Sequence, residues 1–193
     1  VVKIQSACFE RYLWTGVELM WDLIQQAQRH DLLVILDAKR GDIGISSAHY
    51  AAGCLGDPSF ADCEDMQGPD ALTVHSYLGV DALQPMLDLA AAQRKGLFAL
   101  VRTSNPGSDP LQAQQLASGV TVAQAVARMI ADAGQGYLGQ CGYSLLGAVV
   151  AATKPEEIAE LREILDRQWL LVPGFGAQGG DAASVRACFD EHG

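Results

Sequence analysis

Residues 34–44, VILDAKRGDIG, join an apolar run to four charged residues that fall within six positions. The run begins two residues earlier with a leucine pair, and its composition is typical of a buried β-strand. The charged residues at its end are Asp37, Lys39, Arg40 and Asp42. In α/β proteins, reactive side chains gather where parallel strands end. This stretch therefore predicts a parallel strand whose carboxyl end contributes to a functional site.

Apolar β-rich runs recur along the chain and alternate with helical patterns. The runs are VVKIQSACF (1–9), LLVILDAK (32–39), DALTVHSY (70–77), GLFALVRT (96–103), LLGAVVAAT (145–153) and WLLVPGF (169–175). Helices are expected at approximately 16–30, 46–56, 79–94, 120–134, 155–167 and 181–190. Pro155, two residues after Thr153, and the capping residue Asp181 mark two helix starts. Strands that alternate with helices predict βαβ units and an α/β fold.

A doubly wound sheet and a (β/α)8 TIM barrel would both fit this alternation. Nearly every run ends in reactive or glycine-rich residues, namely DAK, HSY, RTSN, AAT and PGFGAQGG. A barrel gathers all of its strand ends at one mouth, whereas an open sheet concentrates them at one switch point, so the pattern favours the barrel. A full barrel has eight strands and typically ~250 residues. Residues 1–193 are therefore expected to form a single, partial barrel domain with about six of the eight βα units, and both ends look cut.

The net charge and the cysteine content indicate which kinds of partner, compartment and metal site to expect. The net charge of −10 disfavours nucleic acid or an anionic membrane as the main partner. No apolar run approaches the roughly 20 residues of a membrane span, and no signal peptide is expected before the first strand. The cysteines are odd in number and show neither CxxC spacing nor a histidine at ligand spacing, so we expect reduced thiols in the cytoplasm and no metal site. They are Cys8, Cys54, Cys63, Cys141 and Cys188.

The charged residues of 34–44 form a candidate acid–base cluster. Side chains alternate along a strand, so Asp37 and Lys39 are expected to share one face, and Gly41 is expected to turn the chain before Asp42. Two carboxylates beside an ammonium favour its charged form, which would make Lys39 a proton donor. The alternative is an ion pair that closes a strand end, with Asp42 starting a helix.

LDAKRGDIG resembles the Asp-x-Lys-x-x-Asp-Ile signature of the orotidine 5′-phosphate decarboxylase family, in particular its longer bacterial branch. KIQSACFE, DALTVHSYLG, LFALVRTSNPG, GYSLLGAVVAAT and LVPGFGAQGGD also have counterparts there, in the same order. The resemblance implies a (β/α)8 barrel that forms a homodimer with active sites at the subunit interface. It further implies that orotidine 5′-phosphate loses CO₂ to give UMP, without a metal or an organic cofactor.

The resemblance also implies roles for individual residues. Lys39 would protonate C6 of the pyrimidine, and Asp37 would lie beside the substrate carboxylate. Asp42 would reach into the neighbouring subunit's site, and Lys3 would contact the ribose and the catalytic carboxylates. Residues assigned to substrate binding are Ile43, Ser46, Ser104, Pro173, Gln178, Gly179 and Gly180.

Two loops carry most of the expected substrate contacts. Ser104, in RTSNPG, would read the pyrimidine edge; the alternative is a hydroxyl that satisfies its own loop backbone. In PGFGAQGG, Gln178, Gly179 and Gly180 would grip the phosphate, because glycines let N–H groups face an anion and a helix N-terminus adds favourable potential. The alternative there is an ordinary glycine-rich turn. Ile43 would line the pyrimidine pocket, and Ser46 keeps the hydroxyl of a threonine that is usual in the family.

The chain departs from the family pattern at several positions. Ile4 replaces a usual proline, His75 and Ser76 replace Asn-Pro, and Ala151 replaces a glycine. The ribose-binding aspartate of the family's first strand and the phosphate-binding arginine of its last strand are not among these residues. The three tryptophans, Trp14, Trp21 and Trp169, are expected to pack between helices and strands.

Two rival functions stay open. One is a Mg²⁺-dependent sugar-phosphate decarboxylase or aldolase of the same suprafamily, which shares the Asp-x-Lys-x-x-Asp motif. The other is a non-catalytic barrel fragment that binds a nucleotide. The RTSNPG and PGFGAQGG loops favour the nucleotide enzyme.

Overall fold

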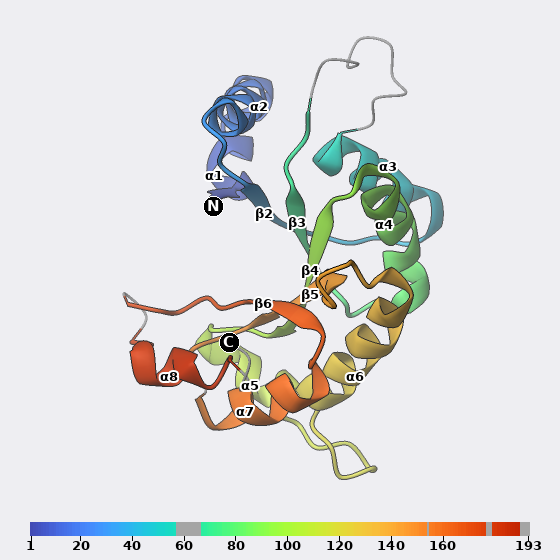
Figure 1. Ribbon diagram of the computed structural model, residues 1–193, viewed down its shortest axis with the longest axis vertical. Coiled ribbons are helices and arrows are strands. Elements are labelled where there is room, and N and C mark those ends of the chain that lie inside the picture. Colours follow the sequence, from blue (N-terminus) through green and yellow to red (C-terminus); the bar gives the residue numbers. More distant parts are fainter. Residues whose placement is uncertain (57–66, 154, 177–178, 190–193) are drawn as a thin grey trace. The chain divides into compact units, whose positions relative to one another are not determined.

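The computed structural model describes residues 1–56, 67–153, 155–176 and 179–189, and its strands alternate with helices throughout (Figure 1). Hydrogen bonding orders the strands β1-β2-β3-β4-β5-β6. The strands are β1 (Val2–Gln5), β2 (Val34–Arg40), β3 (Ala71–Val74), β4 (Gly96–Arg102), β5 (Ser144–Val150) and β6 (Gln168–Leu171). The helices are α1 (Ser6–Glu10), α2 (Leu13–Arg29), α3 (Gly44–Leu55), α4 (Val80–Gln93), α5 (Asp109–Gln112), α6 (Val122–Gly134), α7 (Pro155–Ile164) and α8 (Ala182–Arg186). Helical crossovers between successive parallel strands confirm the α/β class and the partial (β/α)8 arrangement.

The chain forms two compact units, Val1–Leu97 and Phe98–Gly193. That residues 1–193 make a single barrel domain stays a prediction.

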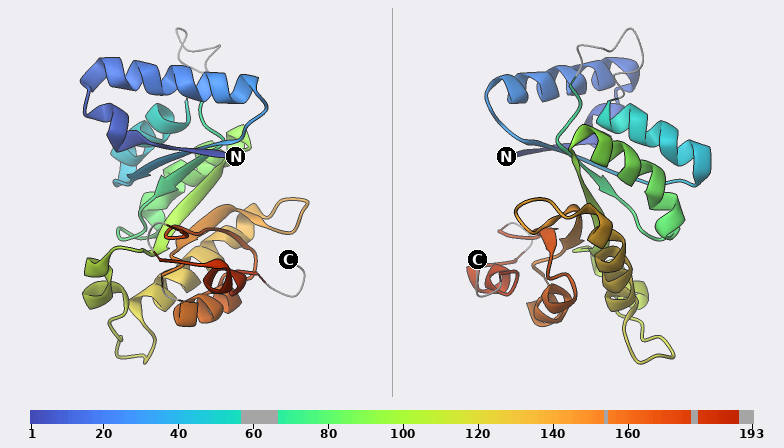
Figure 2. Two further views of the ribbon diagram at one scale, coloured as in Figure 1. Left: turned by 90° about the vertical axis from the view of Figure 1, so that its left-hand side faces the viewer. Right: turned by 45° about the vertical axis from the view of Figure 1, so that its right-hand side comes forward.

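In the first unit, β1 and β2 pair in parallel, and Gln5 stands opposite Asp37. Helix α2 lies against these two strands (Figure 2). Its buried residues Gly16, Met20 and Ile24 are spaced four apart, which places them on one helical face. An apolar stripe on α2 therefore anchors the two strands that carry Lys3 and Asp37.

Helices α3 and α4 pack side by side in the first unit (Figure 1). The buried hydroxyl of Ser47 in α3 donates to the carbonyl oxygen of Ala82 in α4 at 2.7 Å. Around this hydrogen bond the two helices bury Leu55, Leu83 and Leu87 completely. This packing fixes the start of α3, which follows directly after Asp42 and Ile43.

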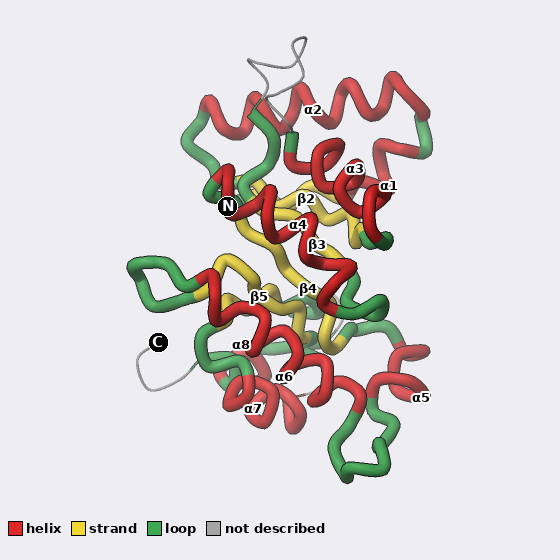
Figure 3. Tube along the Cα trace, turned by 90° about the vertical axis from the view of Figure 1, so that its right-hand side faces the viewer, coloured by secondary structure: helices red, strands yellow, loops and turns green. Residues whose placement is uncertain are grey.

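In the second unit, α6 packs against β5 and α7 (Figure 3). Thr121 caps α6 by accepting a hydrogen bond from the amide of Gln124, and the Gln124 side chain returns a bond to the amide of Thr121. The buried apolar residues of α6, β5 and α7 include Ala123, Ala127, Ile130, Leu146, Ala148, Val149, Val150, Ile158 and Leu161. They form a core that holds the carboxyl end of β5 in place.

The structure confirms the two predicted helix starts. Helix α7 begins at Pro155, and the carboxylate of Asp181 accepts a hydrogen bond from the amide of Ser184 at 2.8 Å at the start of α8. The β-rich run at residues 1–9 predicts a strand, but only its first half forms one. Strand β1 ends at Gln5, and residues 6–10 form the helix α1. A side chain at Gly16 of α2 would overlap the carbonyl of Phe9. The close contact between α1 and α2 therefore overrides the local β pattern.

The prediction that the tryptophans are packed between helices and strands is wrong for two of them. Trp14 is 74% exposed and Trp169 is 53% exposed. Trp169 stacks on Tyr143, with ring centroids 4.5 Å apart, rather than inserting under a helix.

Candidate functional site

Asp37, in the middle of β2, is the centre of a charged cluster that also includes Lys3 of β1. Its Oδ2 accepts a hydrogen bond from Nζ of Lys3 at 2.7 Å, and its Oδ1 accepts one from Nζ of Lys39 at 2.6 Å. The carboxylate is buried, whereas both lysine side chains are about half exposed. Three of the four residues predicted as catalytic thus lie together, and the partial exposure of the two lysine side chains leaves them accessible to a ligand.

The charges of this cluster keep Asp37 ionised. Burial alone would raise the pKa of its carboxyl group, but hydrogen bonds from Lys3, Lys39 and Thr73 outweigh burial and hold the pKa below its usual value. Two ammonium groups around one carboxylate leave a local charge of +1. This positive charge suits an anionic ligand although the chain as a whole is acidic.

The backbone at Lys39 departs from the regular strand that we expected. Lys39 has φ +50°, a left-handed conformation that non-glycine residues rarely adopt. The pairing of β2 with β3 shifts register between Leu36 and Arg40. Lys39 and Asp37 therefore meet at a bulge and not in a regularly alternating strand.

Arg40, the remaining base of the VILDAKRGDIG stretch, belongs to a different interaction. Its guanidinium pairs with Glu10 of α1 and lies 5.9 Å from the ring centroid of Tyr50 in α3. Arg40 therefore ties β2 to two helices and takes no part in the Asp37 cluster.

Asp42 lies outside the hydrogen-bonded cluster of its own chain. Its Oδ1 accepts a hydrogen bond from the amide of Ile43 at 2.8 Å, and it forms no ion pair among the described residues. Ile43 is 60% exposed, Ile45 is 77% exposed, and Ser46 is also exposed in the first turn of α3. The structure thus places an unpaired carboxylate beside two exposed isoleucines.

Gly41 is required for close packing rather than for a turn. It does not have a positive φ, but a side chain there would overlap the imidazole of His75. The amide of His75 also donates to the carbonyl of Arg40 at 3.0 Å. His75, one of the departures from the family pattern, therefore packs against the backbone between Lys39 and Asp42.

In the second unit, the loop that carries Ser104 is fixed by Arg102 at the end of β4. Arg102 is completely buried, and its guanidinium forms two hydrogen bonds with Glu157 of α7, at 2.6 and 3.0 Å. It also donates to Asp109 at 2.6 Å and to Ser108 at 2.7 Å. Ser104 is half-buried and makes no hydrogen bond among the described residues. Sequence reasoning missed Arg102, although an arginine within the apolar run GLFALVRT was a visible signal.

The loop after β6 contains the other predicted substrate residues. The carbonyl of Pro173 accepts a hydrogen bond from the amide of Ala152, which joins this loop to the end of β5. The amides of Gly179 and Gly180 donate to the carbonyls of Gly176 and Gly174, both at 2.9 Å. This differs from our expectation that these amides face an anion. Gln178 lies outside the described residues.

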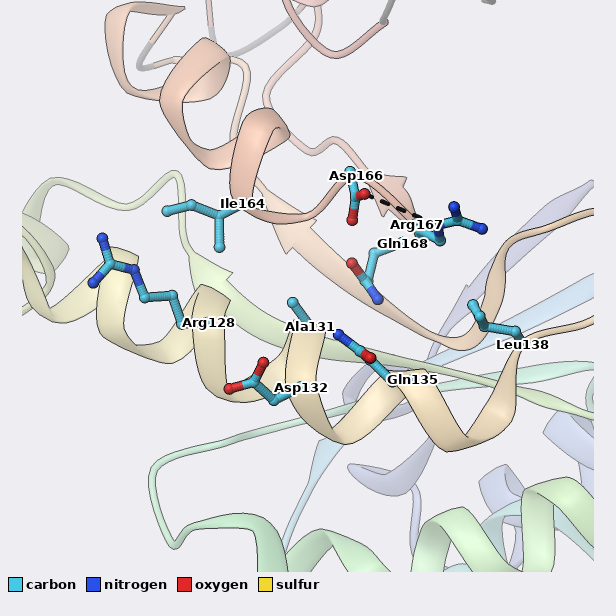
Figure 4. A pocket seen from close by; sticks show the side chains of 9 residues that line it. All are labelled: Arg128, Ala131, Asp132, Gln135, Leu138, Ile164, Asp166, Arg167 and Gln168. Carbon is cyan, nitrogen blue, oxygen red and sulfur yellow. Dashed lines mark ion pairs between the residues drawn. The ribbon is translucent and has the colours of Figure 1, made fainter.

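A polar pocket of about 560 Å³ lies between α6 and the start of β6 (Figure 4). Arg128 and Asp132 of α6 line it, with Asp166, Arg167 and the buried Gln168 facing them. The pocket is at the amino ends of the strands, whereas active sites of (β/α)8 barrels lie at the carboxyl ends. It contains none of the predicted site residues.

Within the described parts of the chain, no group of three or more His, Cys, Asp or Glu side chains could hold a metal ion. Over the same residues, no helix has both the length and the hydropathy needed to cross a membrane. Activity without a metal stays a prediction.

Known proteins are similar to this chain over almost its whole length. An orotidine 5′-phosphate decarboxylase from Rhodopirellula baltica is 43% identical over 192 residues, covering 100% of this chain and 63% of the relative. One from Salinispora tropica is 45% identical, covering 98% of this chain and 64% of the relative. The solved structure of Leishmania donovani OMP decarboxylase matches with a TM-score of 0.75 at 30% identity, covering 96% of this chain and 64% of that one.

The chain therefore spans slightly less than two thirds of the length of these relatives. A family model, described as orotidine 5′-phosphate decarboxylase / HUMPS family, matches residues 1–187. With the ordered motifs and the Lys3–Asp37–Lys39 cluster, this match establishes that the chain belongs to the orotidine 5′-phosphate decarboxylase / HUMPS family.

Proposed function

We propose that the protein is a carboxy-lyase that converts orotidine 5′-phosphate to UMP in pyrimidine biosynthesis. The observation that carries this proposal is the Asp37 carboxylate held between the ammonium groups of Lys3 and Lys39 at 2.7 and 2.6 Å. The named relatives, all called orotidine 5′-phosphate decarboxylases, support the choice of substrate.

In the proposed reaction, the carboxylate of the substrate lies beside Asp37. Two like charges in contact raise the free energy of the bound substrate, and this repulsion is relieved as CO₂ departs. The bond between C6 and the carboxylate breaks, and its electron pair stays on C6. The fixed ammonium groups of Lys3 and Lys39 stabilise this developing negative charge.

Lys39 then completes the reaction by proton transfer. One N–H bond of its ammonium breaks, a C6–H bond forms, and the neutral amine regains a proton from water. The buried Asp37 carboxylate accepts a hydrogen bond from this ammonium at 2.6 Å, which holds the proton donor in place. No metal ion or organic cofactor is needed in this scheme.

The remaining site residues are assigned from the resemblance. Lys3 would also contact the ribose, Ile43 would line the pyrimidine pocket and Ser104 would read the pyrimidine edge. Ser46 and Pro173 would also contact the substrate. Gln178, Gly179 and Gly180 would bind the phosphate; since two of their amides donate within the loop, the loop must open these bonds or use other donors.

We further propose a homodimer in which Asp42 acts in the partner's site. The support is its lack of an ion pair among the described residues of its own chain and its position beside the exposed Ile43 and Ile45. Apolar side chains exposed next to a functional carboxylate fit an interface. The free thiols of Cys8, Cys54, Cys141 and Cys188 support a reducing compartment, and we place the protein in the cytoplasm.

The test is an absorbance assay with orotidine 5′-phosphate, using the complete protein that carries this chain. We expect turnover in metal-free buffer after treatment with a strong chelator. Activity that is lost with the chelator and restored by Mg²⁺ would favour the sugar-phosphate rival. Binding of UMP without any turnover would instead favour a non-catalytic nucleotide-binding protein.

A further inference from the structure

Thr73 occupies a distinctive place opposite the bulge of β2. The pairing of β2 with β3 runs from Leu36 opposite Leu72 to Arg40 opposite Val74. Residues 37, 38 and 39 of β2 therefore stand opposite the single residue Thr73 of β3. Such a bulge leaves backbone groups without a regular ladder partner. Thr73 is only 1% exposed, so water does not readily replace a missing partner there.

The Thr73 hydroxyl satisfies one of these backbone groups and also reaches the carboxylate. It accepts a hydrogen bond from the amide of Lys39 at 3.0 Å and donates one to Oδ1 of Asp37 at 2.9 Å. An amide can only donate and an ionised carboxylate can only accept, so the direction of both bonds is fixed. One hydroxyl thus joins the backbone of Lys39 to the carboxylate that its own ammonium contacts.

This link explains how the unusual backbone of Lys39 is maintained. A non-glycine residue at φ +50° is strained and persists only where its surroundings hold it. The hydroxyl of Thr73 holds the Lys39 amide, and the Lys39 ammonium closes the ring by binding Asp37 at 2.6 Å. A threonine suits this position because its β-branched side chain has few rotamers in a strand.

We propose that Thr73 is a positioning residue for the reaction, holding the Lys39 backbone in its left-handed turn and the Asp37 carboxylate toward the Lys39 ammonium. This inference rests on the proposed function for its kinetic consequences, but its structural consequences can be measured without any turnover. Thr73 acts through Lys39 and Asp37 and is not itself assigned a contact with the substrate.

The kinetic test compares Thr73→Val, which keeps the shape without the hydroxyl, with Thr73→Ser, which keeps the hydroxyl. We expect kcat for orotidine 5′-phosphate to fall roughly 10- to 100-fold in Thr73→Val, the effect of one buried hydrogen-bonding group, with KM changing much less. Thr73→Ser should keep most of the wild-type kcat. Thr15→Val is the matched control, because the exposed Thr15 hydroxyl also donates one hydrogen bond, to the carbonyl of Tyr12.

The second test follows the titration of Asp37 by carbon-13 NMR, with its carboxyl signal assigned by its loss in Asp37→Asn. Among the described residues, the charged groups that face Asp37 are Lys3 from β1 and Lys39 from β2. Since the hydrogen bond from Thr73 lowers the pKa of Asp37, Thr73→Val should raise that pKa and Thr15→Val should not. If Thr73→Val does not fold, Thr73→Cys should shift the pKa in the same direction, because a thiol is a weaker hydrogen-bond donor.

The two tests separate this inference from the proposed function. If the wild type does not act on orotidine 5′-phosphate but the Asp37 titration shifts as stated, the function is wrong and the structural role of Thr73 holds. The inference is overturned if Thr73→Val leaves the Asp37 titration unchanged. It is also overturned if the valine and serine variants lose kcat equally, since the hydroxyl would then not be the operative group.

Discussion

The ammonium of Lys39 lies 2.6 Å from Oδ1 of Asp37, two positions earlier on the same strand. In a regular strand, residues two apart project in parallel, roughly 6.5 Å from one another. Here the backbone of Lys39 departs from a regular strand and turns into the left-handed region at φ +50°. The proposed proton donor and its carboxylate partner are thus held together by the backbone as well as by their charges.

The ionisation of Asp37 gives a prediction for the pH dependence of stability. Its folded-state pKa lies below the unfolded value of 3.8, so the stability that it contributes is present above pH 3.8 and is lost as the pH falls through the folded-state value. The difference in unfolding free energy between wild type and Asp37→Asn should therefore be constant near neutral pH and shrink only in acid. Urea unfolding of both proteins between pH 3 and pH 7 measures this.

The control for this experiment is Asp22→Asn, which changes an exposed carboxylate of α2. Its difference from wild type should stay small across the whole pH range. A difference for Asp37→Asn that instead declines between pH 7 and pH 5 would mean that the pKa of Asp37 is raised.

Asp42 gives a prediction about shared active sites. Inactive Lys39→Ala subunits mixed with inactive Asp42→Ala subunits should regain part of the wild-type activity. A mixed dimer would have one site that carries both changes and one site that carries neither. The measurement is turnover after the subunits have exchanged, with exchange verified by mass spectrometry of differently labelled chains. A mixture that exchanges but stays inactive would place Asp42 in the site of its own chain.

Arg102 gives a prediction for stability. Arg102→Met removes a completely buried guanidinium that binds Glu157 and Asp109. Loss of one partner from a buried ion pair costs about 3–5 kcal/mol, and we expect the lower end because both carboxylates are partly exposed and can be hydrated. Arg128→Met, at an exposed arginine of α6, is the control and should change stability by less than ~0.5 kcal/mol. Equal unfolding free energies for the two variants would contradict the bonding role of Arg102.

Local patterns in the sequence were sufficient to predict much of the fold and the cluster. The six apolar runs predicted six strands, and the charged residues after the second run predicted that Asp37 and Lys39 meet. The place of Lys3 depended on the family resemblance, and the parallel pairing of β1 with β2 brings it to Asp37.

Features that depend on tertiary contacts could not be predicted in this way. The left-handed turn at Lys39 occurs at a residue type that rarely adopts it, and the contact that we propose to hold it comes from Thr73 on the next strand. The role of Arg102 depends on Glu157, which lies 55 positions away. The amides of Gly179 and Gly180 form hydrogen bonds within their own loop. The glycine content of the loop does not predict whether such amides bind the loop backbone or a ligand.

The central claim is that Lys39, held by Asp37, carries the decarboxylation. The most direct measurement is kcat for orotidine 5′-phosphate in the Lys39→Ala variant of the complete protein, with cooperative unfolding checked in parallel. Proton transfer by a placed side chain contributes roughly 10²–10⁴-fold, so we predict a loss of at least about 100-fold in a protein that still unfolds cooperatively. A folded Lys39→Ala variant that keeps more than about a tenth of the wild-type kcat would contradict the assignment of Lys39 as the proton donor.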